Sequence, residues 1–135
     1  MLPRSVLAAK GSEVFRKELF KSAKKIEVLS LKNKGKWIFD VHPCYTVLLT
    51  TFSKGIFNKN EINIKGPITS MKEFLSIKND PIPSFSSEEV LSWNESATLP
   101  QLNGLDDVNV FLKLRLAPNL SSDKSGEWLA RPVQG

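Results

Sequence analysis

The chain has 135 residues, a length that fits one domain or a part of a larger one. Hydrophobic residues make up 41% of it, which is enough for a packed core. The single cysteine, Cys44, excludes an intrachain disulfide and a cysteine-based zinc site, and it suits a reducing cytoplasm. No run of about 18 apolar residues occurs and the first residues lack a signal-peptide pattern, so neither a membrane span nor secretion is expected.

The net charge of +5 is unevenly distributed. Residues 1–60 contain 12 Lys/Arg and 4 Asp/Glu, a balance of +8, whereas residues 61–135 contain 7 and 10, a balance of −3. A basic half beside an acidic half favours contact of the first half with a polyanion such as nucleic acid. Solvated lysines that keep the protein soluble are the alternative explanation.

The first predicted elements are a strand end and a helix. Residues 2–9 are expected to end a strand and continue as a loop. A helix is predicted over residues 12–24, with Ser12 as its N-cap. Its apolar stripe, at a spacing of four, consists of Phe15, Leu19 and Ala23. The basic residues would lie on the remaining faces: Arg16, Lys17, Lys21 and Lys24.

Two strands and a connecting loop follow. Residues 25–31 alternate between apolar and polar side chains and predict a strand. A basic turn over residues 32–36, a short apolar patch and a proline-containing loop lead to residues 45–53. This second stretch is rich in β-branched and aromatic residues and nearly uncharged, so we expect a central strand buried on both faces.

The second half is predicted to form a looser layer of short elements. Residues 61–65 alternate as a short strand. Ser-x-x-Glu capping boxes at Ser70 and Ser86 predict two helix starts, the first for a helix over residues 71–77. Apolar residues at helical spacing predict a further helix over residues 105–116.

Few residues support metal or nucleophilic chemistry. His42 is the only histidine, which excludes a histidine-based zinc cluster. His42 and Cys44 are close in sequence, but a catalytic pair is disfavoured because nothing else indicates an activated thiol. Neither a GxGxxG nor a GxxxxGK[ST] phosphate loop is present. The acidic pairs at predicted helix starts are explained by the helix dipole.

The strongest candidate surface is basic. Its lysines lie on predicted loops at strand ends: Lys10, Lys32, Lys34 and Lys36. Trp37 and Phe39 follow directly, and a lysine can bind phosphate while a nearby ring stacks on a base. In the alternative interpretation, Trp37 and Phe39 are core residues and the lysines are solvated.

Five features in order carry a resemblance: a P-x-S step ending a strand, a helix with an FR…L pattern, a strand, a loop with an FD element, and a hairpin strand. They are Pro3-Arg4-Ser5, Phe15-Arg16 with Leu19, residues 25–31, Phe39-Asp40, and residues 45–53. In order and spacing they resemble the gamma-type adenine-N6 DNA methyltransferases of restriction–modification and phage-defence systems. Beyond Gly55 the likeness is limited to Gly66-Pro67, Pro100, Trp128 and Arg131-Pro132.

The resemblance implies an activity and a role for Phe39. Enzymes of this family flip an adenine out of the duplex and transfer a methyl group from S-adenosylmethionine to its N6. An aromatic ring before the last hairpin strand stacks on the flipped base, which restores roughly 1–3 kcal/mol, and Phe39 occupies that position. Lys10 and the lysines of residues 32–36 would flank the DNA cleft.

Two motifs of the family are absent: the cofactor-binding glycine motif and the Asn/Asp-Pro-Pro-Tyr/Phe motif. We therefore expect no catalytic residue in this chain and no binding of S-adenosylmethionine by this chain alone. The expected partners are double-stranded DNA and the remainder of the methyltransferase or another subunit. A non-catalytic nucleic-acid-binding module and a protein-interaction module are the alternative functions.

The expected fold class is α/β or α+β, with a small mixed sheet and flanking helices, as a fragment of a Rossmann-like class I methyltransferase domain. Residues 1–56 would be the C-terminal sub-region of that domain, with an antiparallel hairpin. Residues 57–135 would form a linker or extension toward a target-recognition domain. A truncated sheet exposes an edge and an apolar face, which favours self-association.

Overall fold

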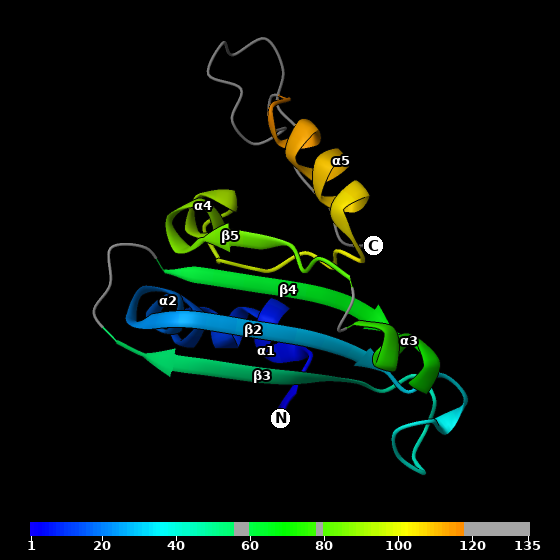
Figure 1. Ribbon diagram of the computed structural model, residues 1–135. Helices are drawn as coiled ribbons and strands as arrows, with labels where there is room; N and C mark the ends of the chain where they lie inside the picture. The colour runs from blue at the N-terminus through cyan, green and yellow to red at the C-terminus, as the bar shows by residue number, and fades with distance from the viewer. Residues whose placement is uncertain (56–59, 78–79, 118–135) are drawn as a thin grey trace, which may run out of the picture.

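The computed structural model describes residues 1–55, 60–77 and 80–117. A five-stranded mixed sheet, in the order β1-β3-β2-β4-β5, forms its centre, and the helices α1, α2 and α4 pack on one face (Figure 1). The elements are β1 (Leu2–Pro3), α1 (Ser5–Ala8), η1 (Lys10–Ser12), α2 (Glu13–Ser22), β2 (Ala23–Lys32), η2 (Lys34–Lys36), β3 (Thr46–Lys54), β4 (Glu61–Ile68), α3 (Met71–Ser76), β5 (Ser84–Ser86), α4 (Ser87–Trp93) and α5 (Leu105–Arg115). The mixed α/β fold class is confirmed. In the described part of the chain, no helix is long and apolar enough to cross a membrane.

The central strand is β2. It pairs antiparallel with β3, which confirms the predicted hairpin, and parallel with β4 on its other side. The expectation that residues 45–53 form a central strand buried on both faces is wrong, because β1 pairs with only Val47 and Leu48 of β3. Leu48 is buried, while the last four residues of β3, from Thr51 to Lys54, are exposed.

The two faces of the sheet belong to separate hydrophobic clusters. On the first face, Ile26 and Val28 of β2 pack with residues from both halves of the chain, including Phe20 of α2 and Val90 of α4. On the second face, a smaller cluster consists of Leu31, Ile68 and Ile77, with partly buried Trp37 and Phe74 against it. The expected boundary at residue 56 therefore falls between strands of one sheet, and both clusters contain residues from either side of it.

A bulge in β4 lets this strand contribute to both clusters. Lys65 pairs with Leu29, but the next recorded pair is Ile68 with Leu31, so β4 has one residue more than β2 at this point. Gly66 occupies the bulge with φ +118°, and an added Cβ would collide with the carbonyl oxygen of Ser30. Only glycine fits this combination of backbone angle and close approach.

Helix α2 corrects three expectations for the first residues. Its buried residues are Arg16 and Phe20, whereas Phe15, predicted for the buried stripe, is 48% exposed. Residues 2–9 include the short helix α1 after β1, so they are not only a strand end and a loop. The side chain of Ser12 makes no capping hydrogen bond, because the 3-10 turn η1 leads directly into α2.

Arg16 is buried because three carbonyl groups surround its guanidinium group. Nη1 donates to the carbonyls of Val6 and Ala9 at 2.9 and 2.8 Å. Nε and Nη2 donate to the carbonyl of Ser96 at 3.2 and 2.7 Å. Burial lowers the pKa of this guanidinium group from its usual value. Arg16 thus joins α2 to α1, to Ala9 and to the segment after α4.

Two short helices of the second half begin at the predicted capping boxes. Ser70 accepts a hydrogen bond from the Glu73 N–H at 3.2 Å, and Ser86 accepts one from the Glu89 N–H at 3.1 Å, so both predicted helix starts are confirmed. The predicted helix over residues 105–116 is α5, which packs Val108 against the first-face cluster. The expected looser layer is wrong for β4, which lies inside the sheet and pairs with β2 on one side and β5 on the other. Trp128 and Arg131-Pro132 lie outside the described residues.

Candidate nucleic-acid interface

The candidate interface is the loop between β2 and β3, residues 33–45, which extends from one end of the sheet (Figure 1). Its organising residue is Asn33, which is 1% exposed. The Asn33 Oδ1 accepts hydrogen bonds from the N–H groups of Ile38 and Phe39 at 3.1 and 3.2 Å. Its Nδ2 donates to the carbonyls of Phe39 and Val41 at 2.9 and 3.2 Å. One side chain therefore holds the backbone of Phe39 from both sides.

The neck of the loop is closed by a backbone hydrogen bond from the Asn33 N–H to the Tyr45 carbonyl at 2.9 Å. The chain reverses through Gly35, with φ +70°, and Lys36, with φ +59°. Two successive residues in the left-handed region make a tight turn, which favours glycine at the first position. The sequence signal for this turn was the predicted glycine-containing turn over residues 32–36, but the role of Asn33 was not predicted.

The environments of Trp37 and Phe39 differ. The sequence allowed either residue to be in the core or at the surface. The Trp37 ring packs against Phe74 of α3, with 6.2 Å between ring centroids, and its Nε1 donates to the Lys32 carbonyl at 2.8 Å. Trp37 therefore belongs to the second-face cluster. Phe39 belongs to neither cluster, and it is 38% exposed.

Three of the four predicted lysines lie at this end of the sheet. Lys32 ends β2, and Lys34 and Lys36 lie in η2, all with exposed side chains. Lys36 forms an ion pair with Asp40 at 2.7 Å, which offsets part of its charge. Within the described residues, Lys32 and Lys34 form no ion pair, so their charges are available to an anion.

The fourth lysine, Lys10, is not part of this loop. It lies in η1, which connects α1 to α2 on the first face of the sheet. Figure 1 shows α1 and α2 behind the sheet, whereas the loop extends beyond the strand ends. The structure therefore brings together Phe39, Lys32, Lys34 and Lys36, and places Lys10 in the helical layer.

His42 and Cys44 are both exposed in the same loop, but they do not form a nucleophile–base pair. The Nδ1 of His42 accepts a hydrogen bond from the backbone N–H of Cys44 at 3.3 Å, and not from its thiol. This contact closes a turn of the loop together with the hydrogen bond from the Tyr45 N–H to the His42 carbonyl. Within the described residues, no group of three or more His, Cys, Asp or Glu side chains could hold a metal ion.

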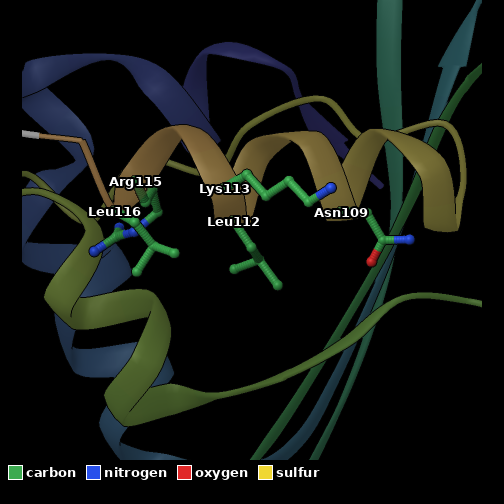
Figure 2. Close-up of a pocket in the computed structure, with 5 residues that line it drawn as sticks. All are labelled: Asn109, Leu112, Lys113, Arg115 and Leu116. Carbon is green, nitrogen blue, oxygen red and sulfur yellow. The ribbon is translucent and has the colours of Figure 1, made fainter.

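A hollow of about 500 Å³ lies beside α5, away from this loop. Figure 2 shows the residues that line it: Asn109, Leu112, Lys113, Arg115 and Leu116. Arg115 has a structural contact on this side, since its guanidinium carbon lies 5.7 Å from the centroid of the Trp93 ring and its Nη2 donates to the Ser92 carbonyl at 3.3 Å. Arg115 thereby joins α5 to α4.

Comparisons of the chain with protein-family models, with curated proteins and with solved structures found no match.

Proposed function

We propose that this chain supplies the DNA-facing, base-stacking part of an adenine-N6 DNA methyltransferase of a restriction–modification system. In this proposal the sheet and helices of residues 1–55 correspond to part of a Rossmann-like class I methyltransferase domain. Double-stranded DNA and a polypeptide carrying the two absent motifs are its partners. The single observation that carries the proposal is the presentation of Phe39 by Asn33.

The geometry of Phe39 suits a base-stacking role. Both polar groups of its backbone are bound by the amide of Asn33, which is itself buried, so the position of Phe39 is fixed without packing its ring into the core. A base that leaves the duplex loses its stacking partners, and an aromatic ring held at a protein surface replaces them. A fixed, exposed ring costs little conformational entropy to bind.

The lysines beside the loop suit contacts to the DNA backbone. Lys32, the last residue of β2, and Lys34, the first residue of η2, are exposed three residues and one residue before Gly35, where the tight turn begins. Phosphate contacts of this kind give affinity that depends on salt but not on sequence. The ring would therefore provide the preference for an extruded base, and the lysines would provide general attraction to the duplex.

The cofactor, S-adenosylmethionine, belongs in this proposal to the complete enzyme. The hollow enclosed by the sheet beside Val28 and Ser30 holds about 50 Å³, well below the roughly 300–1,000 Å³ of small-molecule sites. The larger hollow beside α5 is lined by residues of one helix and its end, with no glycine-rich turn that could approach a cofactor. These residues do not fit the cofactor, and no step of methyl transfer is assigned to them.

The proposal is tested by fluorescence-anisotropy titration with two duplexes. One carries an adenine opposite an abasic site, so that the base leaves the helix easily, and the other is fully paired. We expect the chain to prefer the first duplex and Phe39→Ala to lose that preference by roughly 5- to 150-fold, as a stacking contribution of about 1–3 kcal/mol implies. Circular dichroism would check that the variant keeps its fold.

The matched control is Phe15→Ala, which removes a ring of similar exposure from α2. It should leave the preference unchanged, because Phe15 is 48% exposed on the helical layer and not in the loop. Equal binding of both duplexes, fading with salt, would support a non-catalytic charge-driven binder instead. An absence of binding at low salt would overturn both interpretations.

A further inference from the structure

Strand β3 forms the border of the sheet along most of its length. Among the described residues, only Leu2 and Pro3 pair with it on the side away from β2, and they cover Leu48 and Val47. Figure 1 shows β3 as the outer long strand with the N-terminus beside it. Every second residue after Leu48 therefore directs its backbone N–H and C=O away from the sheet, as on any uncovered edge.

This edge lacks the features that usually prevent strand addition. Residues 49–53, Leu-Thr-Thr-Phe-Ser, contain no charge and no proline, and Lys54 is the only charged residue of the strand. Phe52 is 59% exposed beside the free edge. The opposite border is different, because β5 has three residues and leads directly into α4.

We propose that residues 50–54 of β3 pair antiparallel with the same residues of a second copy of this chain. An antiparallel edge is self-complementary under a two-fold axis perpendicular to the sheet, so no second kind of surface is needed. This axis keeps equivalent faces of the two sheets on the same side. Because directly opposed residues of antiparallel strands point to the same face, the residue at the centre of the ladder must then lie opposite the same residue of the other copy. Centred on Phe52, the ladder pairs Thr50 with Lys54 and Thr51 with Ser53 of the other copy.

The charges and apolar groups of the edge fit this arrangement. The two Lys54 side chains lie at opposite ends of the ladder, so the only charges on the strand do not face each other. The two Phe52 rings become directly opposed, where aromatic cross-strand pairs stabilise a sheet. The ladder also satisfies backbone groups that pair with no other described residue in the single copy. Phe39 is not part of this edge, so dimerisation does not depend on the proposed function.

The first test is sedimentation equilibrium of the full chain over a hundredfold range of concentration. We expect a reversible monomer–dimer equilibrium for the unaltered chain. Phe52→Lys should weaken the dimer at least ~10-fold, because it places two like charges opposite each other at the centre of the ladder. Phe15→Lys is the matched control and should leave the equilibrium unchanged. A monomer at every concentration, or an equal effect of the two substitutions, would overturn the proposal.

The second test measures the register and needs no charged substitution. Phe52→Cys in a Cys44→Ser background should form an intermolecular disulfide under mild oxidation, because directly opposed Cα atoms of antiparallel strands lie within disulfide range. Phe15→Cys in the same background is the control and should not crosslink. Equal crosslinking of both variants would mean random collision and would exclude the proposed pairing.

Discussion

Replacement of Asn33 by alanine removes the side chain that holds the candidate interface loop together. Four hydrogen bonds disappear: two from the N–H groups of Ile38 and Phe39, and two to the carbonyls of Phe39 and Val41. A neutral hydrogen bond contributes about 0.5–1.5 kcal/mol net to the free energy of unfolding, so four of them contribute about 2–6 kcal/mol. Phe39 and Val41 are exposed, and water can reach their freed polar groups. We therefore expect Asn33→Ala to lower the free energy of unfolding by about 2–3 kcal/mol.

Urea denaturation followed by tryptophan fluorescence measures this change, since Trp37 lies in the same loop. The matched control is Asn109→Ala on α5, an exposed position where the change should stay within about 0.5 kcal/mol. Asn33→Ala should also reduce the preference for the extruded adenine, because Phe39 loses both of its backbone partners. Unchanged stability together with an unchanged preference would refute the reasoning that Asn33 positions this loop.

Two further predictions concern the sheet and the helical layer. Arg16→Met should lower the free energy of unfolding by about 3–5 kcal/mol in urea denaturation, because the buried guanidinium group and its hydrogen bonds to three carbonyls are lost, whereas Lys17→Met should change it little. The hydrogen bonds from the Lys25 ammonium and the Thr51 hydroxyl hold the pKa of the Glu27 carboxyl below its usual 4.5. A lowered folded-state pKa contributes stability above pH 4.5 that is lost as the pH falls through the folded-state value. Glu27→Gln should thus be less stable than the unaltered chain at neutral pH, by under ~1 kcal/mol since Glu27 is half-exposed. Thermal unfolding should show this difference shrinking as the pH falls below 4.5, and a difference that stays constant would contradict the assignment.

The elements with strong local signals could be predicted from the sequence. The alternation over residues 25–31 and the capping boxes at Ser70 and Ser86 are local patterns, and each gave an element close to its observed position. The order of the strands could not be predicted in this way. Residues 45–53 have a composition that suits a central or a border strand equally well, because pairing partners are not encoded in the strand itself.

The roles of Arg16 and Asn33 could not be predicted either, because they depend on contacts that form only when the chain folds. Arg16 was placed on the polar side of its helix by residue type, but a carbonyl 80 positions later in the chain accepts two of its hydrogen bonds. Asn33 lies among lysines in a turn, where its composition indicates exposure, and it becomes buried only because the chain folds back over it. Phe39 could be selected as a candidate from its position before the hairpin strand. The sequence could not predict that Trp37 packs against the second-face cluster while Phe39 does not.

The bulge at Gly66 has a consequence for how sequence changes combine. Ile64 and Ile68 are only four residues apart on β4, yet the extra residue directs them to the clusters on opposite faces of the sheet. Their side chains share no packing neighbours, so the energetic effects of altering them should be additive, as for distant sites. The bulge thus separates the packing of the two clusters within one strand. Side chains on either face of the sheet can be replaced while the other face keeps its packing, provided that position 66 remains glycine.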